Sequence, residues 1–365
     1  MVDFTPSSLF SVERLSQLHK ALIAIDNTVV HLAALPDTGL AHDHVWISRD
    51  TGPDWIARLP KQSQMQLDPE TNLEYQANCF RRAAQSGHTP DLHAILPISA
   101  DFPRGGLLVS AIEGRQARLP DDLPAIGEAL AHLHDIAVPP VAARPPLQSP
   151  HSPWTAMRDE VLAQATYLDD APIDEATRWR LDSELTLFND DRELAERIDA
   201  QRCLISFDAH PGNFLITSEG KAVLVDLEKC RYGHPGLDLA HASLYTSTTW
   251  DPASYAVLDT ATVVDFYRHW WATRHTTNEV MDVEALVATR RAMWLWSTTW
   301  CAKWLTLHHQ ERDLQAQGED WSAALSEDQL IAHVEDRARH YLSSPVIERV
   351  SDDNHRLSRE LSRAR

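Results

Sequence analysis

Near the middle of the chain, three polar side chains follow short apolar segments at positions where hairpin strands would bring them together. The segment CLISFDAHPGNFLI, residues 203–216, carries Asp208 and Asn213 in a polar loop between two apolar runs. Asp226 ends the next apolar run, AVLVD. Because neighbouring strands of a hairpin present their ends at one edge, we expect two carboxylates and one amide oxygen to meet there.

This set of groups has what phosphoryl transfer requires of a protein. One carboxylate accepts the proton of an attacking hydroxyl group, and hard oxygen ligands hold magnesium against the phosphates of a nucleotide. The alternative is that Asp208 belongs to an ordinary turn, which the Pro-Gly three residues later would favour. The combined spacing of Asp208, Asn213 and Asp226 favours the catalytic interpretation.

Several segments also resemble a known family. DAHPGN (208–213) and VDLE (225–228) resemble the catalytic and metal-binding loops of the aminoglycoside phosphotransferase and choline kinase family, which has a protein-kinase-like fold. GHPGLDLAH (233–241) is similar to the segment that supports the metal loop of that family through a buried Asp, here Asp238. Together these motifs are specific, whereas each alone would be weak.

The resemblance implies a function and the roles of three residues. Asp208 would be the catalytic base, and Asn213 and Asp226 would be the magnesium ligands. ATP and Mg²⁺ would be the cofactors. The acceptor would be a hydroxyl group of a small molecule, such as an amino sugar or aminoglycoside, a choline-like compound or a sugar metabolite. Neither the exact substrate nor the oligomeric state follows from the motifs.

The resemblance extends toward the N-terminus. DWIARLP (54–60) resembles the third strand of the N-lobe, which implies that Arg58 contacts the nucleotide phosphates, with Lys61 as the alternative. Glu74 in the next helix would be the partner of this cation, with Glu70 as the alternative. A solvated surface pair of Arg58 and Glu74 explains the same pattern equally well.

The next similar segment is LLVSAIEG (107–114), which resembles the hinge of the family. The backbone from Ser110 to Ile112 would therefore pair with adenine. GEALAHLHDI (127–136) is similar to the helix that opens the C-lobe.

Two features depart from the family pattern. The family has His-Gly directly before the catalytic Asp, whereas this chain has Ser206 and Phe207. Its glycine-rich phosphate loop is reduced to Gly39 in TGLAHDHVW. Both departures favour an alternative function, a pseudokinase-type nucleotide-binding or scaffold protein without turnover. Retention of all three chemical residues favours an enzyme instead.

Periodicity predicts the elements of the first third of the chain. Apolar residues at helical spacing predict a helix over residues 7–32. Residues 44–59 read as two strands joined by a turn at 50–53, and a helix is expected over 69–86, ended by Gly87. The apolar run 107–112 predicts a further strand.

The later part of the sequence favours helices. We expect helices over 123–136, within 155–199 and over almost all of 253–343, and a charged tail after about residue 350 that frays. This order predicts an α+β protein of the protein-kinase-like, two-lobed class, with a ligand site in the cleft between the lobes. Residues 1–113 would form a small β-rich N-lobe, and residues 114–365 a large, mainly helical C-lobe.

One predicted helix is rich in tryptophan. Trp296, Trp300 and Trp304 are spaced four apart and share a face, and Trp294 lies in the same segment. They could form an aromatic wall for a cation or a sugar. The pattern favours the alternative, that these side chains belong to the helix core.

Composition restricts the partners. The formal charge is −20, from 33 basic and 53 acidic residues, which disfavours nucleic acid and anionic membranes as partners. The charge would suit a cationic substrate, although it could serve solubility alone. The four cysteines lack zinc-site spacing, the N-terminus lacks the pattern of a signal peptide, and no apolar stretch could span a membrane. These features predict a cytoplasmic protein.

Overall fold

The computed structural model describes residues 11–36, 41–63, 65–186, 188, 191–274, 280–309 and 328–363. Gly39, the predicted glycine of the phosphate loop, lies outside the described residues. The chain divides into two compact units. Unit 1 comprises Met1–Ala84, Pro90–Ile112 and Leu307–Asp336, and unit 2 comprises Gln85–Thr89, Glu113–Thr306 and Arg337–Arg365.

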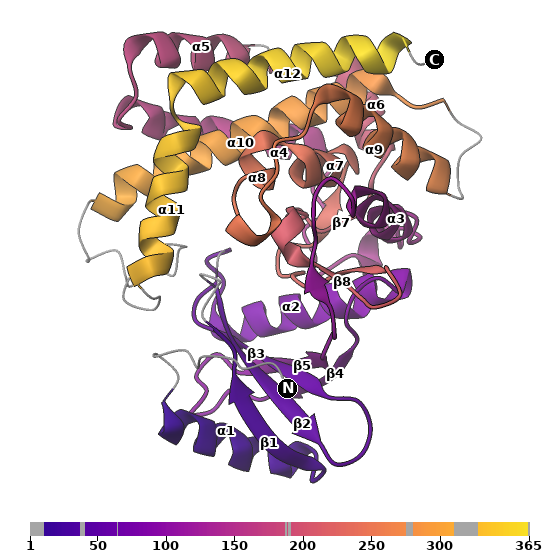
Figure 1. The fold of residues 1–365 in the computed structure, drawn as a ribbon, viewed down its shortest axis with the longest axis vertical. Helices are drawn as coiled ribbons and strands as arrows, with labels where there is room; N and C mark the ends of the chain where they lie inside the picture. The colour runs from indigo at the N-terminus through magenta and orange to yellow at the C-terminus, as the bar shows by residue number, and fades with distance from the viewer. Residues whose placement is uncertain are drawn as a thin grey trace. The chain divides into compact units, whose positions relative to one another are not determined.

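Unit 1 is built on an antiparallel sheet with the strand order β1-β2-β3-β5-β4 (Figure 1). The strands are β1 (Val29–Ala34), β2 (His42–Arg49), β3 (Trp55–Pro60), β4 (Leu92–Leu96) and β5 (Gly106–Ser110). Two helices, α1 (Val12–Ile25) and α2 (Pro69–Ala83), pack against this sheet. Leu18 and Leu22 of α1 join Val45, Ile47 and Leu59 in one buried apolar cluster, which holds α1 on the sheet.

Local sequence sets the ends of α2. The side chain of Asp68 accepts hydrogen bonds from the backbone N–H groups of Glu70 and Thr71, and Pro69 occupies the first turn. A short 3₁₀ helix η1 (Ala84–Ser86) follows, and Gly87 leaves it with φ of +69°. The predicted helix over 69–86 is therefore confirmed, as are the two strands predicted over 44–59.

The helix predicted over residues 7–32 is wrong at its C-terminal end. The α1 helix ends at Ile25, and the chain forms β1 from Val29 onward. The side chain of Asp26 accepts hydrogen bonds from the backbone N–H and the hydroxyl of Thr28, which favours a turn over another helical turn. Strand β4 was not predicted.

Unit 2 is mainly helical. Most of its helices are α3 (Leu123–His134), α4 (Pro153–Ala165), α5 (Glu175–Thr186), α6 (Arg192–Ala200), α7 (Gly236–Ser243), α8 (Tyr245–Thr248), α9 (Thr260–Thr273), α10 (Val283–His309) and α12 (Ser344–Arg363). Helix α11 (Asp328–Tyr341) is divided between the units, and the last three residues of α10, 307–309, belong to unit 1. None of the described helices is long and apolar enough to cross a membrane.

Two small antiparallel sheets in unit 2 carry the polar loops. Strand β7 (Cys203–Ile205) pairs with β10 (Arg231–Gly233). Strand β8 (Phe214–Ile216) lies between β6 (Arg115–Gln116) and β9 (Ala222–Leu224). The hairpin expected to hold Asp208 and Asn213 is therefore divided between two sheets, with the loop crossing from β7 to β8.

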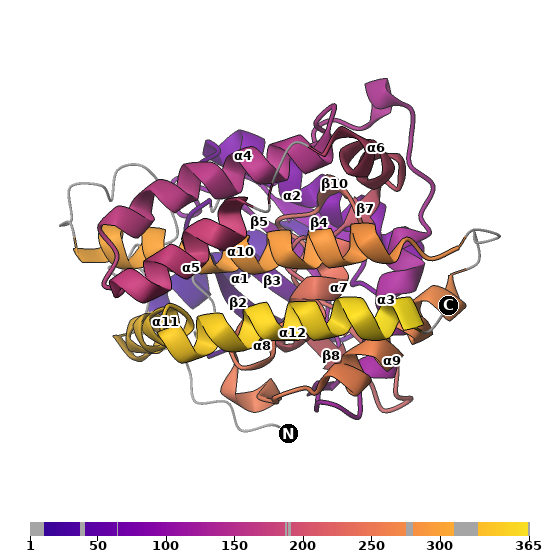
Figure 2. The same cartoon turned by 90° about the horizontal axis from the view of Figure 1, so that it is seen from above.

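The prediction that the tail frays is wrong. Helix α12 runs to Arg363 and packs against α5 and α9, as Figure 2 shows from above. Val350, Leu357 and Leu361 are buried at helical spacing, while charged side chains occupy the rest of the helix surface. The high charge of the tail concealed this apolar stripe.

The tryptophans of α10 divide into two pairs. Trp294 and Trp304 are fully buried, so the core interpretation holds for them. Trp296 and Trp300 are half-buried. The indole N–H of Trp296 donates to Glu160 over 2.7 Å, and the ring of Trp300 packs edge-on against Trp250.

Candidate active site

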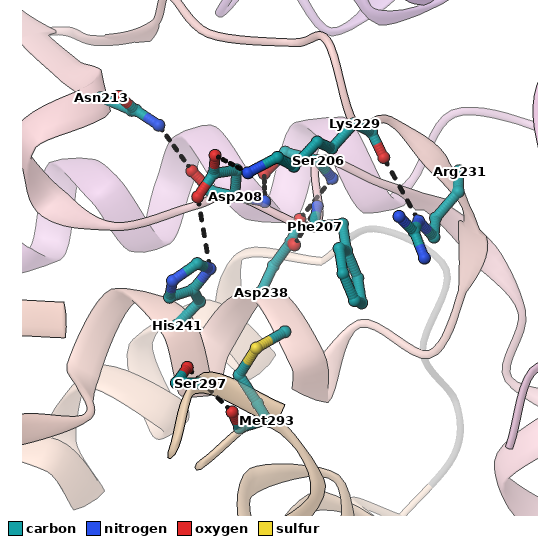
Figure 3. Close-up of polar contacts among 10 residues, drawn as sticks. All are labelled: Ser206, Phe207, Asp208, Asn213, Lys229, Arg231, Asp238, His241, Met293 and Ser297. Atoms are coloured by element: carbon teal, nitrogen blue, oxygen red, sulfur yellow. Dashed lines mark hydrogen bonds and ion pairs between the residues drawn. The ribbon is translucent and has the colours of Figure 1, made fainter. Parts of the chain in front are cut away.

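The loop from β7 to β8 is closed by its own hydrogen bonds. Asp208 follows β7, and residues Pro211–Asn213 form a short 3₁₀ helix, η4, before β8. The Nδ2 of Asn213 donates to the backbone carbonyl of Asp208 over 2.8 Å, as Figure 3 shows. The backbone N–H of Val225 donates to the carbonyl of Asn213, which places the following residue, Asp226, beside the same loop. The structure thus gathers Asp208, Asn213 and Asp226 in one region of unit 2.

Two basic side chains approach the carboxylate of Asp208. The Nζ of Lys229 lies 3.0 Å from one carboxylate oxygen, and Nδ1 of His241 lies 3.8 Å from the other (Figure 3). Burial is the largest single influence on Asp208 and opposes its ionisation, but Lys229 and the neighbouring His210 and His241 together outweigh it, so the pKa of Asp208 lies below its ordinary value. Burial lowers the pKa of His241 to about 4, so this ring is neutral at neutral pH. Asp208 is therefore ionised and paired with Lys229.

A buried chain of hydrogen bonds from Trp270 through His134 to Asp238, the Asp238 relay, fixes the backbone directly before Asp208. The two carboxylate oxygens of Asp238 accept the N–H groups of Ser206 and Phe207, each over 2.8 Å. Trp270 donates its indole N–H to Nδ1 of His134, which leaves Nε2–H of His134 to donate to Asp238 over 3.2 Å. Asp238 is fully buried. The predicted role of Asp238 as support for the loop agrees with these contacts.

The residues predicted for nucleotide phosphates lie in unit 1. Arg58 is buried on β3, with its guanidinium 5.4 Å from the centre of the Phe80 ring. Lys61 is also buried, and its Nζ lies 3.8 Å from a carboxylate oxygen of Asp43. Glu74 is exposed on α2. Within the part of the chain that the structure describes, Glu74 forms no ion pair with Arg58. The roles of Arg58 and Glu74 remain predictions.

The predicted adenine-binding backbone is the last segment of the sheet in unit 1. The backbone N–H of Ser110 donates to Asp91, and that of Ala111 donates to Asp54. Both groups are thus already bonded within unit 1. Ile112 follows them and is half-exposed. The roles of Ser110 and Ile112 in adenine binding remain predictions.

A family comparison decides the identity of the chain. The model of the phosphotransferase enzyme family matches residues 34–274, which is more than half of the chain. The chain belongs to this family. The predicted family and the predicted phosphotransferase activity class are confirmed.

Solved structures support the same fold for this phosphotransferase. A macrolide 2′-phosphotransferase from Brachybacterium faecium matches with a TM-score of 0.55 and 17% identity, over 91% of this chain and 98% of that chain. Choline kinase from Streptococcus pneumoniae matches with a TM-score of 0.55 and 14% identity, over 90% and 98% of the two chains. A spectinomycin phosphotransferase in complex with ADP and spectinomycin matches with a TM-score of 0.51 and 13% identity, over 89% and 97%. At these identities the likeness establishes the fold, and the predicted kinase-like fold is confirmed. No curated protein matches the sequence significantly.

The family resemblance explains one strained residue of the phosphotransferase. Phe207 occupies the position where the family has Gly, and its φ is +62°. This left-handed conformation costs a non-glycine residue about 1–2 kcal/mol. The Phe207 ring is buried, with the Arg231 guanidinium 3.7 Å from its centre and the Trp296 ring edge-on at 5.2 Å. Packing of the aromatic ring therefore offsets the strain, and the loop keeps the turn that a Gly would adopt freely.

A cavity of about 450 Å³ lies beside Phe207. Glu160 and Arg231 are part of its wall and pair with each other over 3.4 Å. The cavity is within the size range of small-molecule pockets. It is large enough to take part of an acceptor, provided that the acceptor tolerates an ion pair in the wall.

Lys229 and His241 were not singled out from the sequence. Lys229 lies directly after the VDLE motif, and His241 ends the GHPGLDLAH motif, so both stand within segments that had been recognised. The signal that could have found them is a basic residue immediately beside a metal-binding motif, since such a residue can compensate a group of carboxylates.

Proposed function

We propose that this phosphotransferase transfers the γ-phosphate of ATP to a hydroxyl group of a small molecule, with Asp208 as the base. The observation that carries the proposal is the placement of an ionised Asp208 on a loop shared with Asn213 and next to Asp226. The ADP in the complex of the spectinomycin phosphotransferase supports an adenine nucleotide as the donor.

The proton-accepting role of Asp208 follows from its environment. A carboxylate that is ionised at neutral pH is in the form that accepts a proton from an attacking hydroxyl group. Lys229 holds that charge in place, and the Asp238 relay holds the backbone. We propose that Asp208 orients the hydroxyl group of the acceptor, because the contact with Lys229 and the support of the preceding backbone by Asp238 hold the Asp208 carboxylate in a fixed position.

The residues of the loop fit a magnesium ion. The Nδ2 of Asn213 donates to the carbonyl of Asp208, so Oδ1 is the side-chain atom that would bind a ligand. The carboxylate of Asp226 and this amide oxygen are hard oxygen donors of the type that Mg²⁺ prefers. We propose Asn213 and Asp226 as its ligands. When bound, magnesium would neutralise charge on the β- and γ-phosphates.

The acceptor remains open among amino sugars, choline-like compounds and sugar metabolites, but one contact favours an amine. A Cβ built on Gly212, within the catalytic loop, would lie 2.7 Å from Oδ2 of Asp251. The half-exposed carboxylate of Asp251 therefore lies against the loop between Asp208 and Asn213. Together with the net charge of −20, this position favours a cationic acceptor.

Replacing Asp251 by Asn is expected to raise the KM for an amine-bearing acceptor by about 10–100-fold, since a hydrogen bond to a charged group is lost. The KM for ATP should stay unchanged. Asn still caps η5 (Pro252–Ser254), whose Ala253 N–H the side chain of Asp251 accepts, so folding is preserved. Steady-state kinetics with the acceptor varied measure the effect, and an unchanged acceptor KM would remove Asp251 from the acceptor site.

The proposed function is tested by ADP release with Mg-ATP across a panel of aminoglycosides, choline, ethanolamine, homoserine and common sugars. The Asp208→Asn protein is the control for contaminating activity. Release that depends on one compound and is absent from the control supports the kinase and identifies its acceptor class. ATP binding without release from any member of a broad panel would favour the nucleotide-binding scaffold.

Replacing Lys229 by Met is expected to move the acid limb of the pH profile of kcat/KM to higher pH. Lys229 lowers the pKa of Asp208, so its removal raises that pKa, and Asp208 becomes protonated and inactive at a higher pH. The measurement is kcat/KM between acidic and neutral pH with the acceptor found in the panel. Lys20→Met, on the exposed surface of α1, is the matched control. An unshifted acid limb would show that another group titrates there.

A further inference from the structure

We propose that His88, Glu128 and His132 form a binding site for a divalent transition-metal ion, with zinc as the best fit, outside the catalytic loop. The potential ligand atoms of the three side chains all lie within 4.8 Å of one another. Glu128 and His132 are four residues apart on α3 and therefore share one face of the helix. His88 reaches the cluster from the segment Gln85–Thr89, which belongs to unit 2 although it interrupts unit 1 in sequence.

Hydrogen bonding prepares His88 as a ligand. Its Nδ1 lies 2.9 Å from the backbone carbonyl oxygen of Ala222. Because a carbonyl oxygen can only accept a hydrogen bond, Nδ1 carries the proton, and Nε2 has the lone pair that can bind a metal. Histidines that bind metals almost always donate their other ring N–H to a carbonyl or carboxylate in this way. The carbonyl of His88 also accepts the N–H of Leu224 over 2.8 Å. Both contacts fix His88 on β9.

Protonation and charge agree with a metal site. Burial lowers the pKa of His88, with the nearby charge of Lys221 acting in the same direction, so the ring is neutral and able to coordinate. Glu128 supplies a negative charge that opposes the ammonium group of Lys221. Lys221 lies directly before β9 and is exposed, so its side chain can turn away from the cluster when a cation binds.

The geometry requires only a small closure. Zinc bonded to nitrogen at about 2.0–2.1 Å places tetrahedral ligands about 3.3 Å apart. The rings of His88 and His132 are stacked with centres 4.9 Å apart and planes 12° apart, so the His132 ring must turn to bring a nitrogen toward the ion that His88 binds through Nε2. Glu128 is exposed, and rotation of its side chain can complete the set. Two imidazoles and one carboxylate, with water in a fourth position, form a donor set that zinc uses in proteins.

The site would act on the scaffold rather than on the reaction. It would join the segment Gln85–Thr89 to α3, and His88 is already bonded to both ends of β9. The chain leaves β9 at Leu224 and reaches Asp226 two residues later. A bound ion would therefore stabilise the strand that leads to the proposed magnesium ligand.

The test is zinc binding to the full-length protein after treatment with EDTA and dialysis, in excess Mg²⁺ so that the catalytic loop does not compete. Isothermal titration calorimetry compares the wild type with Glu128→Gln and His132→Ala. The matched controls are Glu348→Gln and His355→Ala, which change exposed side chains of α12. Glu128 is exposed, so its variant should fold as the wild type does.

We expect the wild type and both controls to bind one equivalent of zinc at this site, and the two ligand variants to bind it at least about 10-fold more weakly. Zinc should raise the melting temperature of the wild type and controls only. Cobalt(II) in place of zinc should give the visible absorption of a four-coordinate ion, lost in both ligand variants. The same affinity, stoichiometry and cobalt spectrum in all five proteins, or no zinc binding by the wild type, would overturn the proposal.

Discussion

An Asp208→Asn protein is expected to bind Mg-ATP as the wild type does and to turn over about 10²–10⁴-fold more slowly. An amide cannot take up the proton of the acceptor hydroxyl, but it is nearly isosteric with the carboxylate. Its oxygen can still accept a hydrogen bond from Lys229, and the backbone carbonyl of residue 208 still accepts Nδ2 of Asn213. The loop should therefore keep its conformation while losing its base.

Two measurements separate this loss from misfolding. Rapid ADP-release assays give kcat with the acceptor found in the panel, and calorimetry gives the Kd of Mg-ATP. Asp226→Asn serves as the contrasting variant, because loss of a proposed metal ligand should weaken magnesium-dependent nucleotide binding as well as kcat. If Asp208→Asn turned over at the wild-type rate, the carboxylate would not be the base, and the proposed mechanism would fail even with nucleotide binding intact.

The core of the site could be predicted because its residues are close together in sequence. Asp208 and Asn213 lie in one loop, and Asp226 follows β9, the hairpin partner of β8, so this loop and the β8–β9 hairpin bring them together. The support of this loop by Asp238 is predicted differently, from the resemblance of GHPGLDLAH to the family segment, because Asp238 lies 32 and 31 residues after the two residues whose N–H groups it accepts. The kinase-like fold followed from the motifs rather than from periodicity.

Contacts set by tertiary packing could not be predicted. His241 reaches Asp208 from α7, and the sequence does not specify which way a histidine on a buried helix points. Likewise, His88 meets His132 across elements that are far apart along the chain, so no spacing motif reveals the cluster. Sequence motifs detect ligands that share a loop or a helix turn, but not ligands brought together by packing.

Two boundary errors have a common physical origin. Both predictions rest on local composition, which does not show which side chains the fold makes available for packing. Residues 29–32 continue an apolar helical pattern, but β-branched Val29 and Val30 follow a turn, and the strand that begins at Val29 pairs with β2 instead. In α12 the high charge predicts a frayed tail, although buried Val350 and Leu357 attach the helix to unit 2. Tertiary packing overrode composition in both cases.

Replacing Asp238 by Asn is expected to lower the free energy of unfolding by about 3 kcal/mol and to reduce kcat with little change in the Kd of Mg-ATP. Asp238 accepts from three donors: the N–H groups of Ser206 and Phe207 and Nε2–H of His134. Asn offers one oxygen, and its NH₂ group would face at least one of these donors. A fully buried donor without an acceptor loses its hydration and gains nothing in return.

The relay cannot easily repair this mismatch. His134 could accept from the new amide only by moving its proton from Nε2 to Nδ1, where the indole N–H of Trp270 already points. The clash between two N–H groups would then lie between His134 and Trp270 in place of His134 and the new amide. Because Phe207 is held at φ of +62° partly by the bond from its N–H to Asp238, the turn before Asp208 should relax toward an ordinary conformation and displace the base.

The matched control is Asp259→Asn, the same substitution at the N-cap of α9. The side chain of Asp259 accepts the N–H of Thr262, a role that Asn fills equally well, so stability should change by less than about 0.5 kcal/mol. Urea unfolding followed by tryptophan fluorescence compares the two proteins, with Trp270 as a reporter next to the substituted site. Equal stability of both variants would mean that the loop does not depend on Asp238. A destabilised Asp238→Asn protein with unchanged kcat would mean that the relay supports the fold without positioning Asp208.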